Sequence, residues 1–255
     1  GLVLATTVAT VIFGGISRIS KVVSRLVPLM SLLYVGAAFY ILLLNWSEVP
    51  HYLTLIVTDA FTGMAAAGGA IGTVIATGVR RGAFSNEAGI GTEAMAHGAA
   101  RTSEPVRAGL VAMLGPIIDT LIICTATGLL ILMTGAWQVT DASGVTITSI
   151  AFETALPGYG SFLLIVCIFF FSITTIFSYS YYGSKCLGFL IGAEKKHYYN
   201  YLTIIMTVVA SMLSLNAMVG LIDGAFALMA IPTMTSTIIL APKVMSAART
   251  YFAKI

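Results

Sequence analysis

The sequence predicts an all-α polytopic membrane protein, and its composition and its apolar runs support this fold class. Of the 255 residues, 58% are hydrophobic and only 9% are charged, and the mean hydropathy is +0.98. A soluble domain carries about 25% charged residues. The net charge of +3 is too small to indicate a nucleic-acid partner. The expected surroundings of this chain are therefore a lipid bilayer.

Seven apolar runs approach the length of about 20 residues that one bilayer crossing needs. We expect crossings at residues 1–16, 26–45, 64–99, 108–136, 160–184, 198–221 and 224–242. The chain enters an apolar run at residue 1 without an initiator methionine. We therefore expect a fragment, with further spans before Gly1.

Positive charges alternate along this map. Lysines and arginines follow the first, third, fifth and seventh spans, whereas the segments 46–63, 137–159 and 222–224 contain none. Arg80 and Arg81 are the exception. Because cytoplasmic loops are enriched in Lys and Arg, the pattern predicts a cytoplasmic C-terminal tail at 243–255 and a multi-pass protein of the cell membrane.

Two of the segments without positive charge hold more than a turn. The external segment 46–63 contains an apolar run, and residues 148–156 favour a short helix that ends at Leu156-Pro157-Gly158. Two interpretations fit both segments equally well. They are lids on the outer face, or ordinary interfacial loops anchored by Trp46 and Trp137.

The third span contains a polar, glycine-broken stretch from Gly78 to Ala94. Charges at membrane depth are costly, and irregular backbone persists there only when it is buried in protein or lines a cavity. The stretch therefore fits a helix that unwinds near its glycines and lines a substrate cavity. The unwound backbone would offer N–H groups to a carboxylate and carbonyl groups to a cation. A cytoplasmic loop between two spans is the alternative.

The charged side chains of this stretch also allow two interpretations. Arg80 and Arg81 either pair with Glu87 or Glu93, or attract an anion to the cavity. Further along the chain, Asp119 lies inside the fourth apolar run. An acid in that position is either an ion or proton carrier or a structural hydrogen-bond partner of the broken helix.

A run of hydroxyl side chains crosses the fifth span. Thr174 and Thr175 lie about 100° apart on a helix, one turn after the carbonyl group of Phe171. Three such oxygens suit a small hard cation. The alternative is that both hydroxyls bond to their own backbone, as is common in membrane helices. No Ser-His-Asp set, nucleotide loop or pair of catalytic carboxylates occurs, so the sequence predicts no enzyme.

Four stretches together resemble the C-terminal part of the alanine/glycine:cation symporter family. They are Gly78-Val-Arg-Arg-Gly-Ala-Phe-Ser-Asn-Glu-Ala-Gly-Ile-Gly91, Asp119-Thr-Leu-Ile-Ile-Cys-Thr-Ala126, Tyr179-Ser-Tyr-Tyr-Gly183 and Leu228-Met-Ala-Ile-Pro232. The resemblance implies the inverted five-plus-five helix repeat of the leucine transporter. Residues 1–45 would be the last two helices of the first repeat, and residues 64–242 the whole second repeat, with an outer gate near 148–156.

The resemblance also implies a function. It is the sodium-coupled import of alanine, glycine or a similar small amino acid by alternating access, with sodium as coupling ion and no further cofactor. A proton-coupled carrier or a channel for another small solute on the same fold is the alternative. The implied substrate-binding residues are Phe84, Asn86, Glu87, Gly89, Gly91 and Tyr179, the sodium ligands are Phe171, Thr174 and Thr175, and Asp119 is a possible coupling residue. The family usually has tryptophan where this chain has Tyr179, which implies a different preference for substrate size.

Overall fold

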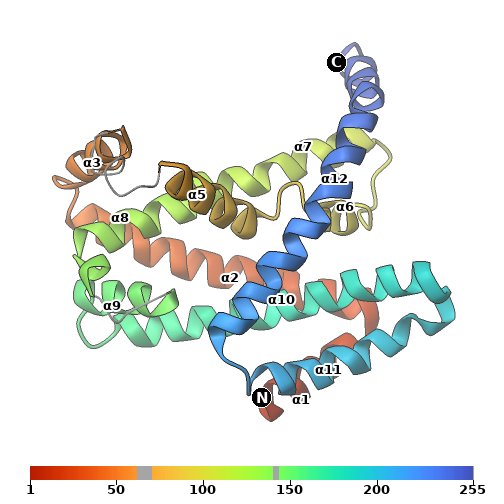
Figure 1. Ribbon diagram of the computed structural model, residues 1–255, viewed down its shortest axis with the longest axis horizontal. Helices are drawn as coiled ribbons and strands as arrows, with labels where there is room; N and C mark the ends of the chain where they lie inside the picture. Colours follow the sequence, from red (N-terminus) through yellow and green to blue (C-terminus); the bar gives the residue numbers. More distant parts are fainter. Residues whose placement is uncertain (62–70, 140–143, 255) are drawn as a thin grey trace. The chain divides into compact units, whose positions relative to one another are not determined.

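The computed structural model describes residues 1–61, 71–139 and 144–254, and every regular element in these ranges is a helix (Figure 1). The expected all-α class is confirmed for this part of the chain. Residues 64–70, which open the third expected span, lie outside the described residues, and so does the side chain of Arg80.

The chain divides into two compact units. The first consists of Gly1–Phe13, Val79–Asp119 and Ser178–Ile255, and the second of Gly14–Gly78 and Thr120–Phe177. Three elements run from one unit into the other, and these are α5 (Ile71–Asn86), the π-helix η1 (Ile117–Cys124) and α10 (Gly160–Ile191).

The second unit packs around α8 (Thr125–Met133). The helices α2 (Gly15–Leu44), α3 (Val49–Phe61) and α9 (Val145–Ala155) each contact α8, and the short 3₁₀-helix η2 (Ala136–Gln138) follows it. Tyr34 lies at the centre, with its ring 5.5 Å from that of Phe152 and its hydroxyl group 2.6 Å from Thr127 Oγ1. A buried tyrosine hydroxyl needs such a partner, so this bond permits the deep packing of the ring.

The helix expected near 148–156 is present as α9, and Leu156 is its C-cap. Ala151 and Phe152 are fully buried on its inner face. The Glu153 carboxylate accepts hydrogen bonds from the N–H groups of Gly158 at 2.7 Å and Ser161 at 2.9 Å. These two backbone hydrogen bonds, with the Ser161 side chain, hold the pKa of Glu153 below its ordinary value. These hydrogen bonds join the C-terminal end of α9 to the start of α10.

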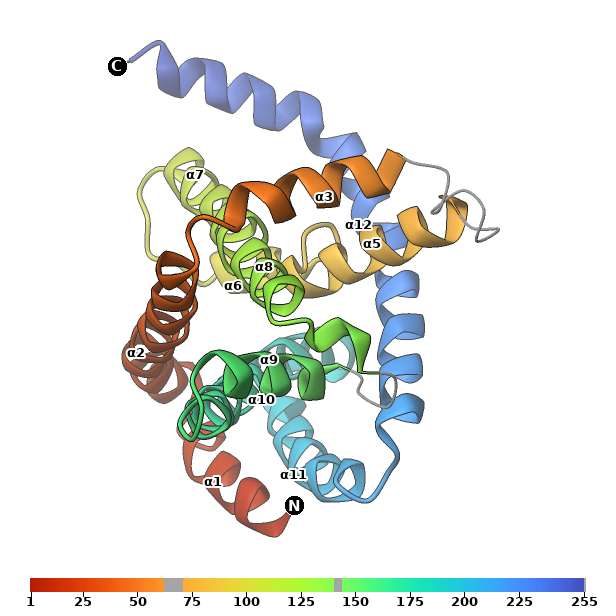
Figure 2. The same cartoon turned by 90° about the vertical axis from the view of Figure 1, so that its left-hand side faces the viewer.

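The first unit contains α1 (Leu2–Ile12), α6 (Thr92–His97), α7 (Pro105–Pro116), the 3₁₀-helix η3 (Ala193–His197), α11 (Tyr198–Ala210) and α12 (Leu215–Phe252). α1 and α11 lie side by side (Figure 1). α7 packs against α6 and α12, and Arg107 Nε donates to the Tyr251 hydroxyl group at 3.0 Å. α12 bends along its length (Figure 2), with Pro232 and Pro242 inside it. A proline interrupts the hydrogen bonding of a helix and so permits such bends.

Four helical segments of the described chain are long and apolar enough to cross a bilayer, where the sequence predicts seven spans. They are Gly15–Leu44, Pro105–Met133, Gly160–Ile191 and Ala217–Phe252. The other three expected crossings contain α1, α5 and α11, of 11, 16 and 13 residues. At 1.5 Å per residue each is shorter than a hydrocarbon core of about 30 Å. A multi-pass membrane protein is nevertheless the class that these four segments support.

The expected boundary between the last two spans is wrong. The sequence places an external segment at 222–224, but α12 runs through these residues and continues to Phe252, so most of the expected tail is also helical. The chain instead turns after Ala210, and Ser214 caps α12 by accepting a hydrogen bond from the N–H group of Ala217. This N-cap, and not the acidic residue at 223, marks where the helix begins.

Candidate functional site

The polar stretch from Gly78 to Ala94 breaks into two helices. α5 ends at Asn86 and α6 begins at Thr92. Between them, Glu87, Gly89 and Gly91 have φ angles of 56°, 87° and 96°. A left-handed residue other than glycine is uncommon, and such residues concentrate at functional sites. The break expected around Gly89 and Gly91 is therefore found, while Gly82 remains inside α5.

The N–H groups of the break, residues 87–91, all donate hydrogen bonds to acceptors in the break or in the helix turns beside it. The Glu93 carboxylate accepts from the N–H groups of Gly89 at 2.9 Å and Gly91 at 3.2 Å. The N–H group of Glu87 donates to Ala83 O at 3.0 Å, and that of Ile90 donates to Glu87 O at 3.2 Å. The N–H group of Ala88 donates to Asn86 Oδ1 at 2.9 Å. A substrate carboxylate would therefore meet amides that already have an acceptor. The N–H groups that the sequence offers to a substrate stabilise the break itself in this structure.

Glu87 extends from the break towards α10. The Tyr179 hydroxyl group donates to Glu87 Oε1 at 2.6 Å, the length of a charge-assisted hydrogen bond. Arg81 is exposed and forms no ion pair with Glu87 or Glu93. The expected pairing of Arg81 with either acid is therefore not found, because a tyrosine hydroxyl and backbone amides serve these carboxylates instead.

A third aromatic side chain connects the two that the sequence selects. The ring of Phe226, on α12, lies 5.2 Å from that of Phe84 and 6.4 Å from that of Tyr179, nearly parallel to the latter. The sequence gives no signal for this role, since Phe226 is one of 13 phenylalanines and lies in an apolar run. The three rings form an apolar wall beside Glu87.

α12 also approaches the backbone of the break. A Cβ atom added at Gly91 would lie 2.9 Å from Thr233 Oγ1, and one at Gly89 would lie 3.0 Å from Met234 Sδ. Both positions therefore need glycine for space as well as for their positive φ angles. Thr92 is 1% exposed, and its hydroxyl oxygen has no hydrogen-bond partner within the described part of the chain.

Asp119 lies in the π-helix η1, directly after Pro116 ends α7. Ser85 Oγ, on the last turn of α5, donates to Asp119 Oδ2 at 2.6 Å. The structural alternative for Asp119, a hydrogen bond to the broken helix, is therefore present. A π-helical turn often marks a functional site, so this bond does not exclude a coupling role.

The second unit holds the expected sodium ligands on α10. Thr174 Oγ1 lies 3.1 Å and Thr175 Oγ1 2.8 Å from the carbonyl oxygen of Phe171. Both hydroxyl groups donate to carbonyl groups of their own helix, as the alternative interpretation expects. Each hydroxyl oxygen nevertheless keeps lone pairs that can bind a cation. Thr174 is buried and Thr175 is exposed, so the two oxygens have different surroundings.

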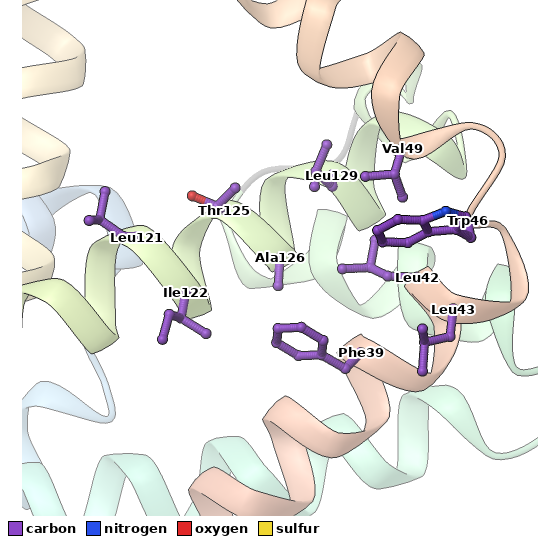
Figure 3. Close-up of a pocket in the computed structure, with 10 residues that line it drawn as sticks. All are labelled: Phe39, Leu42, Leu43, Trp46, Val49, Leu121, Ile122, Thr125, Ala126 and Leu129. Carbon is purple, nitrogen blue, oxygen red and sulfur yellow. The ribbon is translucent and has the colours of Figure 1, made fainter.

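A separate cavity of about 210 Å³ lies within the second unit (Figure 3). Its lining comes from α2, the turn after it, the start of α3, η1 and α8. The lining residues are Phe39, Leu42, Leu43, Trp46, Val49, Leu121, Ile122, Thr125, Ala126 and Leu129. Among these described residues, Thr125 alone has a side-chain hydroxyl group, and none of them is ionisable. It has no group that could neutralise the charges of an amino acid, and we do not assign the substrate to it.

Comparison with known proteins gives a consistent picture. The sodium:alanine symporter family matches residues 1–255. An uncharacterized transporter of Haemophilus influenzae is 37% identical over 259 residues, covering 100% of this chain and 57% of its own length. The sodium/alanine symporter AgcS of Methanococcus maripaludis is 35% identical over 98% of this chain and 56% of its own length. The probable sodium/glutamine symporter GlnT of Bacillus subtilis is 35% identical over 98% and 53%. The chain thus spans about half the length of the curated relatives it matches.

Proposed function

Because the chain belongs to the sodium:alanine symporter family, whose members are transporters and not enzymes, we propose that the protein imports alanine, glycine or a similar small amino acid together with sodium. The cation-coupled transport of amino acids is the common theme of the relatives' names. The specific substrate and the specific ion are our proposal.

The observation that carries this proposal is the interruption between α5 and α6. In this interruption the backbone of Glu87 is in the left-handed conformation, and its carboxylate accepts a hydrogen bond from the Tyr179 hydroxyl group. The interruption lies in a largely apolar chain. Irregular backbone of this kind lines the binding sites of many secondary transporters. We assign the substrate site to Phe84, Asn86, Glu87, Gly89, Gly91 and Tyr179.

The described site is rich in acceptors. Glu87 has a neutral partner, and the N–H groups of Gly89 and Gly91 are taken by Glu93. We therefore assign the positively charged amino group of the substrate to the neighbourhood of Glu87, and its side chain to the wall of Phe84 and Tyr179. A substrate carboxylate would bind to amides of the break only by displacing Glu93, or to groups elsewhere in the protein.

Sodium is assigned to the oxygens of Thr174, Thr175 and Phe171, and Asp119 to a role in coupling. The arrangement of the helices as an inverted repeat, the location in the cell membrane and the cytoplasmic C-terminus belong to the same proposal. We further propose that α9 covers the outer opening of the substrate cavity. The hydrogen bonds of Glu153 to the start of α10 would make α9 and α10 move together.

Uptake of labelled alanine by the complete protein in proteoliposomes tests this function. We expect accumulation that requires an inward sodium gradient and falls to background when choline replaces sodium. Glycine should compete with the labelled alanine. Undiminished uptake in choline, driven by a proton gradient, would instead favour the proton-coupled alternative, and downhill flux that never exceeds equilibrium would favour a channel.

A further inference from the structure

Asp223 is an acidic residue that the proposed site does not use. It is the ninth residue of α12 and so lies about 12 Å along the helix from Leu215, at 1.5 Å per residue. Asp223 is half-buried and lies within this helix, not in an external turn. In membrane proteins, an ionisable residue within an apolar helix often binds a ligand or pairs with a group of opposite charge.

One oxygen of the Asp223 carboxylate has no hydrogen-bond partner among the described residues. This atom, Oδ1, is buried. Glu87, in the break, and Glu93, in the first turn of α6, each accept at least one hydrogen bond from the described residues. A buried carboxylate oxygen without a donor costs more than an ordinary lost hydrogen bond. Asp223 therefore differs from these two acids in having a buried carboxylate oxygen without a donor.

Asp223 is also close, along α12, to a residue that lines the proposed substrate site. Residues three apart are neighbours on a helix face, so Asp223 lies one turn before Phe226 on α12. Phe226 in turn contacts the rings of Phe84 and Tyr179, and Tyr179 donates to Glu87. Asp223 therefore lies one helical turn from the aromatic wall.

We propose that Asp223 binds a positively charged group during transport and forms, with Phe226, the α12 wall of the substrate site. The group is either the ammonium of the substrate or the coupling sodium ion, since a carboxylate oxygen suits both. This inference deepens the proposed function and rests on it.

The test compares two half-saturation constants of the complete protein in proteoliposomes. Asp223→Asn should raise the alanine constant at saturating sodium if the group is the ammonium, or the sodium constant at saturating alanine if it is the ion. The expected rise is about tenfold to a hundredfold, as for loss of a hydrogen bond to a charged group. Asp223→Glu keeps the negative charge and should therefore show a smaller rise in the same constant than Asp223→Asn. Glu194→Gln, at an exposed acid of η3, is the matched control and should change neither constant.

If both constants stay within twofold of the wild-type values while the wild-type protein imports alanine, the assignment of Asp223 is wrong and the proposed function stands. The same conclusion follows if Asp223→Asn lowers the stability of the protein and leaves both half-saturation constants unchanged, since the role of the carboxylate is then structural. A wild-type protein that accumulates no alanine would instead refute the proposed function.

A second measurement needs neither transport nor a change at Asp223. Gly220→Cys places a thiol one turn before it, where an added Cβ meets no atom within 4 Å. In a background with the native cysteines replaced by serine, sodium or alanine at ten times its half-saturating concentration should slow maleimide modification about tenfold. Lactate, which lacks the ammonium group, should not. Gly109→Cys on α7, also in open space, is the control, and equal rates at Gly220→Cys with and without ligand would overturn the proposal.

Discussion

The hydrogen bond from Tyr179 to Glu87 offers the most direct test of how the break is held. Tyr179→Phe removes one oxygen atom and leaves the ring that stacks on Phe226. The change deletes a donor 2.6 Å from a half-buried carboxylate whose backbone is left-handed. No other donor reaches this carboxylate within the described residues, so the variant leaves it without a partner.

The expected cost follows from the charge of the acceptor. A hydrogen bond to a charged group contributes about 1.5–3 kcal/mol, whereas a neutral one contributes about 0.5–1.5 kcal/mol. Because both side chains are only half-buried, we expect a loss of about 1.5 kcal/mol in the free energy of unfolding, the lower end of the charged range. With Glu87→Gln already present, the same tyrosine change should cost roughly 1 kcal/mol less.

The assay is equilibrium unfolding of the complete protein in mixed micelles, with a double-mutant cycle over Tyr179→Phe and Glu87→Gln. Tyr182→Phe is the matched control. Its ring lies 5.6 Å from that of Tyr179, and its hydroxyl group makes no hydrogen bond within the described chain. It should cost less than about 0.5 kcal/mol. An equal cost of Tyr179→Phe with Glu87 and with Gln at that position would refute a charge-assisted bond.

Three further changes test other parts of the structure. Gly91→Ala should destabilise the complete protein by about 1–3 kcal/mol in the same assay, owing to its φ angle and the contact with α12, whereas Gly82→Ala in open helix should not destabilise it. Replacing both Thr174 and Thr175 by alanine should raise the sodium concentration for half-maximal uptake about tenfold, and an unchanged value would remove the ion from α10. Because the folded-state pKa of Glu153 is lowered, its stabilisation is present above the unfolded value of 4.5 and is lost as pH falls through the folded value. Thermal unfolding from about pH 3 to 7 should therefore show a smaller acid-induced loss for Glu153→Gln, and parallel curves would contradict this.

The sequence locates the break well because its signals are local. Glycines, charges and the absence of proline between Gly78 and Ala94 are sufficient to predict a helix that stops and restarts. The helix at 145–155 is predictable for the same reason, since Leu156-Pro157-Gly158 ends it within one turn. In both cases the residues that determine the conformation are also the residues that adopt it.

Features that depend on packing are not predictable in this way. Phe226 becomes part of the site only because α12 lies beside α5 and α10 in the first unit, and no local pattern distinguishes it from other phenylalanines. The N–H groups of Gly89 and Gly91 can donate to Glu93 or to a substrate. Which of these accepts the hydrogen bonds depends on the conformation of a five-residue loop. The start of α12 was misplaced because an acid and a glycine at 223–224 resemble an external turn, while Ser214 is a weak signal within a polar-poor sequence.

The partners of the carboxylates explain why this site should bind cations. Glu87 accepts from a tyrosine and Glu93 from backbone amides, both neutral donors, and Oδ1 of Asp223 accepts from none within the described residues. A neutral donor carries no net charge that could cancel the charge of a carboxylate. Charges that remain in surroundings of low polarity attract a positive group more strongly than they would in water. An arginine partner would neutralise the carboxylate permanently. A tyrosine and two backbone amides do not neutralise it, so a sodium ion or an ammonium group that enters and leaves can do so.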